Sequence, residues 1–320
     1  MCKYGGAFEE NFFGRQPSAR GEALGRGTVA LSGDILSSIN NPAGLADAIG
    51  LTFCTSFSDD RYAVDRADRS FFGVGIPVGR YVGVGFSRYH LDYSTQTVHP
   101  GRRQVTYPSK SSTYTLTLAA APAAHLYIGM NLNLLRSSAG GQDENSYYPD
   151  VGILKVFRRG GSGHTQHRVS MGGSLSNFTN SDVVTAAGDE SLPVTLRIGT
   201  AYRISLAHRS WHERLRTLGL LCHLEYQDVL NSDYFDAYKI GGEVSLLELL
   251  ALRTGYYYEN RSEVEGNDDW VGETTYGLGF GLPIGKLRND APPLRISLDW
   301  VRREDPERYS VYTLCVDWFF

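Results

Sequence analysis

Two groups of residues have types and spacings that could bind a metal. His164 and His167 form a close pair in a Gly-rich stretch, but no third ligand is evident, so a solvated loop is favoured over a metal site. The acidic pairs 59–60 and 268–269 could contribute to a Ca²⁺ site, yet neither has the spacing of a defined calcium loop. GxSxG, HExxH and phosphate-loop motifs are missing. We therefore expect no catalytic residue, no metal and no cofactor.

The four cysteines are widely separated in the sequence. Cys2, Cys54, Cys222 and Cys315 show neither CxxC nor paired spacing, which argues against a zinc site and against a disulfide framework. Three of them fall in segments of alternating hydrophobicity. There we expect them to act as small apolar fillers.

Charged residues recur on the polar face of alternating segments. They are Arg197, Arg203, Glu225, Lys239, Glu243, Arg253, Arg295 and Asp299. Such a row suits a wet interior. Two interpretations stay open: Arg197 and Arg203 pair with Glu225 and Glu243 and rigidify the interior, or the charges guide a permeant.

A period of two begins at Leu51 and continues to the end of the sequence. In the last segment one face carries Tyr312, Leu314, Val316, Trp318 and Phe320, and the other Thr313, Cys315 and Asp317. The other alternating segments lie at 113–118, 126–134, 194–203, 218–227 and 294–300, with weaker ones near 51–57, 70–77, 81–93, 147–157, 167–177, 236–246, 249–258 and 270–282. The pattern predicts an all-β protein of about fourteen strands. A bulge is expected inside 81–93, where apolar residues move from even to odd positions.

These strands are predicted to form a transmembrane antiparallel barrel. No stretch approaches the ~18 continuous apolar residues of a spanning helix, whereas a barrel strand needs about 9–11 residues, alternate ones apolar. The mean hydropathy of −0.27 is compatible with such strands. A soluble β-sandwich or propeller is the alternative, but the charged faces and the alternation of tight and long connections favour a barrel. Trp270, Trp300 and Trp318 are expected in interfacial aromatic girdles.

The first part of the chain lacks alternation, and we expect residues 1–49 to form a small plug, or hatch, for a barrel of residues 50–320. Ser32 or Asp34 could cap a short helix that ends at the Asn-Asn-Pro turn. Its large apolar residues are too few for an independent core, so the barrel lumen is expected to stabilise it: Leu24, Val29, Leu31, Ile35, Leu36, Ile39 and Leu45. The alternative is that this segment lies against the periplasmic rim.

The N-terminal motifs resemble a known superfamily. The run 21–34, followed by Asn41, Pro42, Ala43 and Gly44, resembles the N-terminus of FadL-like outer-membrane proteins. Segments 192–202 and 250–259 resemble the PorV/PorQ branch. The resemblance implies a fourteen-stranded barrel whose hatch contains the Asn-Pro-Ala-Gly turn, although Ile39 replaces the family's usual aromatic residue. The terminal Trp318 and Phe320 are similar to the signal that the outer-membrane assembly machinery reads.

The resemblance leaves two non-enzymatic functions open. One is the passage or binding of hydrophobic small molecules through a plugged barrel. The other is a type IX secretion accessory barrel that binds cargo or translocon proteins. We expect a bacterial outer-membrane location, with membrane lipid and the assembly machinery as partners. The net charge of −4, with scattered Lys and Arg, argues against nucleic acid. Residues 1–20 have no apolar core of a signal peptide, so we expect the leader to lie outside this sequence.

Overall fold

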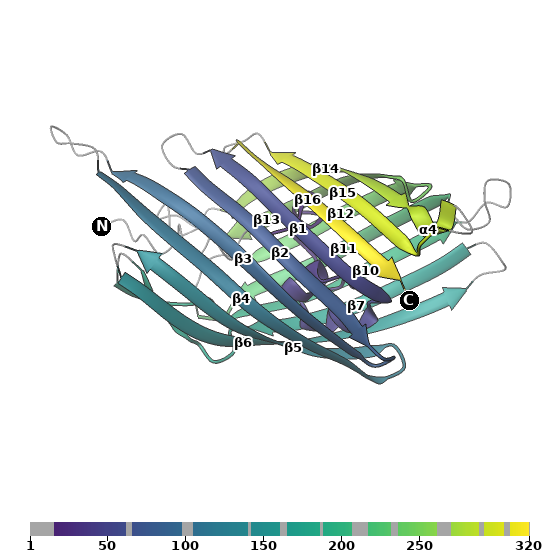
Figure 1. The fold of residues 1–320 in the computed structure, drawn as a ribbon, viewed down its shortest axis with the longest axis horizontal. Helices are drawn as coiled ribbons and strands as arrows, with labels where there is room; N and C mark the ends of the chain where they lie inside the picture. Colours follow the sequence, from purple (N-terminus) through teal and green to yellow (C-terminus); the bar gives the residue numbers. More distant parts are fainter. Residues whose placement is uncertain are drawn as a thin grey trace.

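The computed structural model is a closed antiparallel barrel of fourteen strands (Figure 1). It describes residues 16–61, 66–97, 105–139, 142–160, 165–185, 188–206, 217–231, 236–260, 270–287, 291–303 and 308–319. The barrel closes because β1 (Gly50–Arg61) pairs with both β2 (Arg66–Val78) and β16 (Arg308–Phe319). The predicted fold class and strand number are confirmed.

The remaining strands follow in chain order, each paired with its neighbours. They are β3 (Val82–Thr97), β4 (Val105–Ala123), β5 (Leu126–Ala139), β6 (Gln142–Gly160), β7 (Thr165–Ser176), β10 (Thr195–Leu206), β11 (Leu218–Val229), β12 (Ala237–Leu246), β13 (Leu250–Asn260), β14 (Trp270–Pro283) and β15 (Leu294–Arg303). A small separate sheet, β8 (Asp182–Thr185) with β9 (Gly188–Ser191), is formed by the connection that joins β7 to β10 in the sequence, and helix α4 (Ile284–Leu287) follows β14. No helix in the described ranges is long and apolar enough to cross a membrane.

The barrel has two distinct ends. The end that holds Gly50 and Phe319 also holds the short turns 78–82, 123–126 and 246–250, and we call it the turn end. The opposite end, where β1 finishes at Arg61 and β13 at Asn260, is the loop end. Four outward aromatic rings are in contact at the loop end, with the centroids of neighbouring rings 5.0–5.8 Å apart: Tyr226, Tyr238, Tyr258 and Trp270. Trp318 faces outward at the turn end.

Side chains alternate between an apolar outer face and a polar inner face. Leu298 on β15 is 47% exposed and Leu224 on β11 is 54% exposed, whereas their neighbours Asp299 and Glu225 are 8% and 1% exposed. This arrangement is the inverse of a soluble protein. It is the arrangement expected when lipid surrounds the barrel and the charged groups are enclosed.

The bulge predicted inside 81–93 is wrong. The β2–β3 and β3–β4 ladders run through this stretch without a register shift, and the shift lies instead in β4, between Ala120 and Ala123. Tyr89 and Leu91 therefore remain on the inner face. Tyr89 packs there against an apolar cluster that includes Ile35 of the N-terminal segment. The apolar residues move from even to odd positions because this part of the inner wall packs against apolar side chains of the N-terminal segment.

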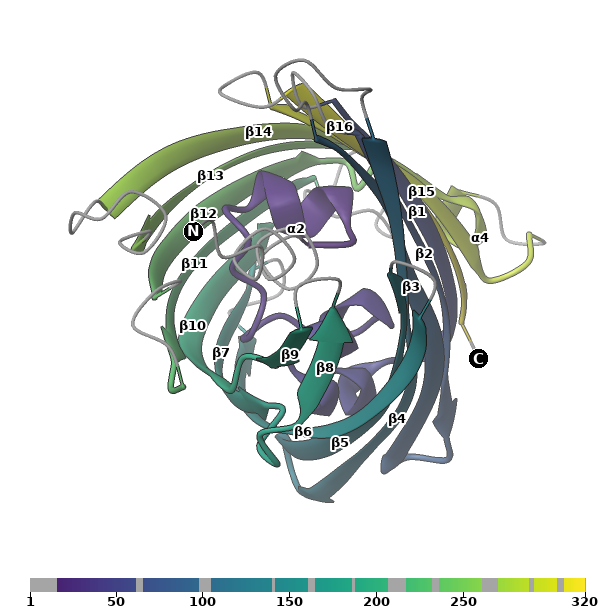
Figure 2. The same ribbon diagram turned by 90° about the vertical axis from the view of Figure 1, so that its left-hand side faces the viewer.

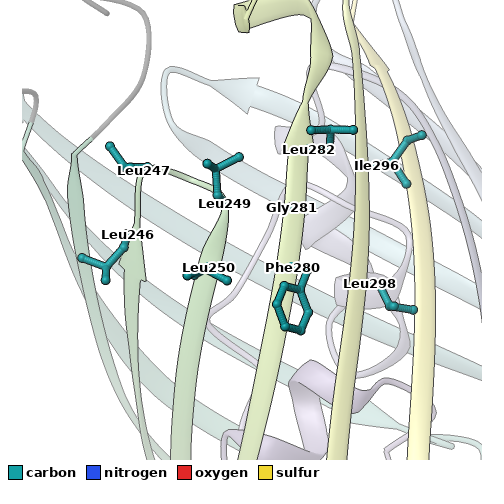
Figure 3. Close-up of a pocket in the computed structure, with 9 residues that line it drawn as sticks. All are labelled: Leu246, Leu247, Leu249, Leu250, Phe280, Gly281, Leu282, Ile296 and Leu298. Carbon is teal, nitrogen blue, oxygen red and sulfur yellow. The ribbon is translucent and has the colours of Figure 1, made fainter. Parts of the chain in front are cut away.

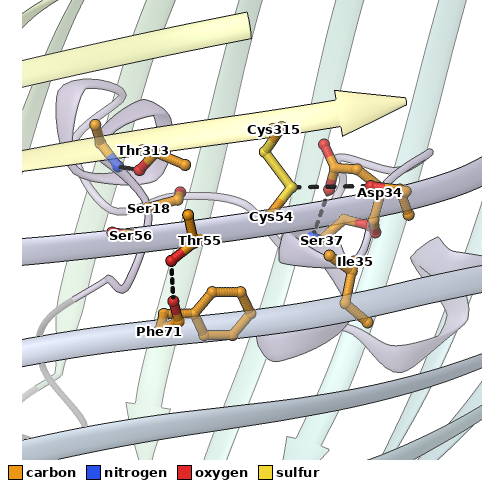
Figure 4. Close-up of a disulfide and its surroundings, with 12 residues drawn as sticks. Ser18, Asp34, Ile35, Ser37, Cys54, Thr55, Ser56, Phe71, Thr313 and Cys315 are labelled. Carbon is orange, nitrogen blue, oxygen red and sulfur yellow. Dashed lines mark hydrogen bonds between the residues drawn. A yellow bond between two sulfur atoms is a disulfide. The ribbon is translucent and has the colours of Figure 1, made fainter. Parts of the chain in front are cut away.

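The expectation that the cysteines form no disulfide is also wrong. Cys54 of β1 and Cys315 of β16 lie directly opposite each other in the ladder that closes the barrel, with Cα atoms 4.2 Å apart, and form a disulfide (Figure 4). The bond spans 261 residues of sequence. Pairing of the first and last barrel strands brings the two residues together. Cys222 is a free cysteine on the outer surface.

Residues 16–49 lie inside the barrel (Figure 2). This N-terminal segment contains helix α2 (Ala19–Ala23) and two 3-10 helices, η1 (Leu36–Ile39) and η2 (Pro42–Asp47). Ser18 caps α2 by accepting a hydrogen bond from the Gly21 amide. Asp34 accepts one from the Ser37 amide at the start of η1. Most residues of the segment are buried, and η2 packs against the inner faces of β3 to β6.

Candidate functional site

Several buried charged side chains lie at the interface between the N-terminal segment and the inner wall. Around Glu243 of β12, Arg20 and Arg253 bring Nε atoms to 2.9 and 2.7 Å from Oε2, and Arg203 Nη2 lies 3.9 Å from Oε1. Arg253 also donates to Asp299 Oδ1 at 2.7 Å. This Glu243 cluster connects helix α2 to β10, β12, β13 and β15. Its carboxylates are neutralised inside the protein, as buried charges require.

A second cluster surrounds Glu225 of β11. Its Oε1 accepts from Lys239 at 3.2 Å, and its Oε2 accepts from the backbone amide of Val29 at 2.8 Å. Lys239 also donates to Gln227 at 2.7 Å, and Arg197 Nε donates to Gln227 at 3.2 Å. The barrel carboxylate thus satisfies a backbone donor of the N-terminal segment.

Asp47, at the end of η2, forms a third cluster that the sequence did not suggest. Its carboxylate accepts from Tyr127 at 2.8 Å and Ser32 at 2.9 Å, and pairs with Arg158 at 2.5 Å and Arg168 at 2.6 Å. Burial by itself would raise the pKa of Asp47, but the two guanidinium groups and the hydrogen bonds outweigh it and hold the pKa below its ordinary value. The segment is therefore anchored to β5, β6 and β7.

The Asn-Pro-Ala-Gly turn connects the N-terminal segment to β6. Asn41 is fully buried; its Oδ1 accepts from the Ala43 amide at 3.1 Å, and its Nδ2 donates to the carbonyls of Val29 at 2.8 Å and Ile153 at 3.0 Å. Pro42 opens η2, where its missing amide hydrogen costs nothing. Ala43 packs with Tyr127. A Cβ on Gly44 would lie 3.0 Å from the Leu31 carbonyl, so the turn and the preceding chain are in close contact.

Glycines on the inner face make room for the backbone of the N-terminal segment. A Cβ on Gly172 would lie 2.2 Å from the Val29 carbonyl oxygen, and one on Gly255 would lie 2.0 Å from the Gly25 amide nitrogen. Equivalent close approaches to the segment occur at Gly83, Gly85, Gly129, Gly152, Gly241 and Gly277. Most of these clashes are with backbone atoms, which could not move aside without shifting the segment.

We compared the chain with known proteins. No family model and no curated protein matches it. Among solved structures, the toluene transporter TodX of Pseudomonas putida aligns over 94% of this chain and 96% of its own, with 12% identity and a TM-score of 0.51. The toluene transporter TbuX of Ralstonia pickettii aligns over 95% of this chain and 98% of its own, with 11% identity and a TM-score of 0.52. A FadL homologue of Pseudomonas aeruginosa aligns over 96% of this chain and 99% of its own, with 10% identity and a TM-score of 0.52.

The chain has a FadL-type fold. At these identities the comparison establishes the architecture, and nothing in it supports the PorV/PorQ branch or the type IX secretion alternative.

Within the FadL-type fold, the other residues singled out from the sequence are placed as follows. Arg197 donates to Gln227 and Ser176, whereas Arg203 is near Glu243. Arg295 lies outside the three clusters, opposite Asp317 in the β15–β16 ladder. Trp318 pairs with Leu51 and Leu294. Phe320, His164 and the acidic pair 268–269 lie outside the described residues, as do the side chains of the pair 59–60.

The structure also has an apolar groove, which lies on the outside of the barrel (Figure 3). It has a volume of about 590 Å³ at the turn end and is lined by Leu246, Leu247, Leu249, Leu250, Phe280, Gly281, Leu282, Ile296 and Leu298. A polar void inside the lumen is much smaller, at about 20 Å³, and lies beside Arg20, Arg168 and Arg203. That is room for roughly one water molecule. The N-terminal segment therefore fills the part of the lumen around this void.

Proposed function

We propose that this chain is a bacterial outer-membrane channel for small hydrophobic molecules, in which residues 16–49 act as a plug. The observation that carries the plug assignment is the complementarity of the two parts: inner-face glycines fit the backbone of the segment, and the Glu243, Glu225 and Asp47 clusters anchor it. The turn end then faces the periplasm, as short turns do in bacterial barrels.

Toward the loop end from the segment, the inner wall has apolar as well as polar positions. Leu91, Leu135 and Tyr148 lie on the inner faces of β3, β5 and β6 and are buried, among inward hydroxyl residues such as Ser111, Thr113 and Ser137. The class of permeant is therefore proposed from the shared fold. The toluene transporters named above share the fold, so toluene is the first permeant to test.

The test of the proposed function is toluene uptake by cells of a bacterial host that carry an intracellular toluene-responsive reporter. The intact chain should raise the initial response several-fold over cells with an empty vector. A hydrophilic solute of similar size, such as a labelled pentose, should enter no faster than in the empty-vector cells. Uptake of toluene equal to the empty-vector rate would contradict the proposal.

A cross-link tests whether the plug must rearrange. Thr117 of β4 and Ser38 of η1 bring their Oγ atoms within 3.5 Å of each other. In the double variant Ser38→Cys, Thr117→Cys, a disulfide should hold the segment against the wall. We expect oxidised cells to lose toluene uptake and a reducing agent to restore it. Each single variant is the control, and full uptake through the cross-linked protein would show that the plug stays in place during passage.

A further inference from the structure

The outer surface of β3, β4 and β5 changes abruptly from apolar to basic near the loop end. Phe86, Leu116 and Leu132 form one outward row across the three strands. Two residues further toward the loop end, the outward positions are occupied by Arg88, Tyr114 and Leu134; beyond them lie Arg136, His90 and Lys110. Such a boundary marks the level at which a barrel leaves the hydrocarbon region.

The basic side chains of this boundary are arranged around one aromatic ring. The guanidinium carbons of Arg88 and Arg136 lie 5.7 and 5.5 Å from the Tyr114 ring centroid. Arg88 also donates to Ser112 Oγ at 3.4 Å. Lys110 Nζ lies 3.0 Å from Asp92 Oδ2, and both of these side chains are largely exposed. We call Arg88, Lys110 and Arg136 the basic patch.

The cations of the patch differ in their partners. Lys110 is paired with Asp92. Asp68 lies opposite Asp92 on β2 and Asp143 lies opposite Ser138 on β6, both further toward the loop end than the two arginines. Arg88 and Arg136 are exposed and make no ion pair with a described residue. A pair of exposed guanidinium groups, held by a ring between them, suits a phosphate, which can accept two parallel N–H donors from each.

We propose that the basic patch binds the phosphate group of an outer-leaflet lipid, whose acyl chains lie along the apolar row below it. Tyr114 occupies the interfacial level, where an aromatic ring places its apolar body in the membrane and its hydroxyl in the headgroup layer. The aromatic rings of Tyr226, Tyr238, Tyr258 and Trp270 are also at the loop end, on other strands of the barrel. The inference depends on membrane insertion of the barrel and not on what the lumen carries.

The test is a titration of the full-length protein in nonionic detergent with diphosphoryl lipid A. Native mass spectrometry measures the fraction of protein that carries bound lipid. The double variant Arg88→Gln, Arg136→Gln should bind about 30-fold more weakly, since each basic side chain near an anionic lipid surface contributes about fivefold. The matched control is Arg80→Gln, Arg159→Gln, which removes two exposed arginines at the turn end and should bind like the unmodified protein. Slower migration after boiling verifies that each variant has folded.

Two further probes separate a lipid phosphate from other ligands. Fully dephosphorylated lipid A should bind poorly, and millimolar inorganic phosphate should not displace the diphosphoryl lipid. Equal affinity of the double variant and the unmodified protein would overturn the proposal. So would tight binding of the dephosphorylated lipid, and displacement by inorganic phosphate would assign the patch to free phosphate instead.

Discussion

Single residues of the inner wall match the N-terminal segment, and only part of this match could be predicted from the sequence. Strict alternation places Glu225, Glu243 and Asp299 on the polar face, and the structure has them there. Their partners could not be inferred, because Arg20 and the Val29 amide belong to a segment without periodicity. The Asp47 cluster was missed for the same reason, although glycines at alternate positions were a visible signal of close approach.

Adjacent glycines of β7 test the fit of the wall. Gly172→Val would place a Cβ 2.2 Å from the Val29 carbonyl oxygen, whereas Gly173→Val points outward, where the nearest atom is 3.7 Å away. We expect the first variant to displace the segment, seen as cleavage within residues 16–49 by an added protease while the barrel stays intact. The second should resist protease as the unmodified protein does. Equal protection of both variants would mean that the backbone of the segment does not pass over Gly172.

Substitution of Asp47 tests the ionic anchor. Asp47→Asn should weaken attachment of the N-terminal segment by about 1–3 kcal/mol, since it leaves Arg168 without its charged partner; the more exposed Arg158 contributes less. Because the folded pKa of Asp47 is lowered, its contribution is complete above the ordinary carboxyl pKa and is lost only as the pH falls through the lowered value. Protease protection of the segment should therefore be constant from about pH 8 to pH 5 and decrease below about pH 4 in the unmodified protein. Loss of protection between pH 7 and pH 5 would contradict this.

At the level of elements, the alternation of apolar and polar residues located the strands, but it did not reveal which inner-face residues pack against the N-terminal segment. The outward apolar residues have a single environment, lipid, so their period of two is regular. The inner face alternates less cleanly, because Phe71 and Tyr89 pack against apolar residues of the segment, and this produced the mistaken bulge. The Cys54–Cys315 pairing required the register of the closing strands, which the sequence spacing of 261 residues does not disclose.

The disulfide gives a prediction about the closing strands. The variant Cys54→Ser, Cys315→Ser should still assemble, because the β1–β16 ladder is unchanged, but should unfold at a lower temperature, with a loss of roughly 2–5 kcal/mol. On a denaturing gel, the boiled, unreduced protein should migrate faster than the boiled, reduced one, since the bond closes most of the chain into a loop. The serine variant should show no such difference. Identical migration of the unmodified protein under both conditions would show that the bond does not form.

The whole molecule consists of a barrel, which is closed by its own strand pairing, and a segment whose position depends on that barrel. The fourteen strands pair in a continuous ring, and this ring does not include residues 16–49. The segment, in contrast, has its helices and its turn held by groups of the inner wall. A barrel without the segment should therefore remain closed, while its lumen loses the material that fills it.

The most direct measurement of this claim is the conductance of the chain lacking residues 18–47 in planar lipid bilayers. The intact protein should give little or intermittent current. The deletion variant should give a larger and steadier conductance, once slower migration after boiling has verified its barrel. The conductance of Gly172→Val should lie between those of the intact protein and the deletion variant. Unchanged conductance in the deletion variant would contradict the account, because the segment would then not be what closes the lumen.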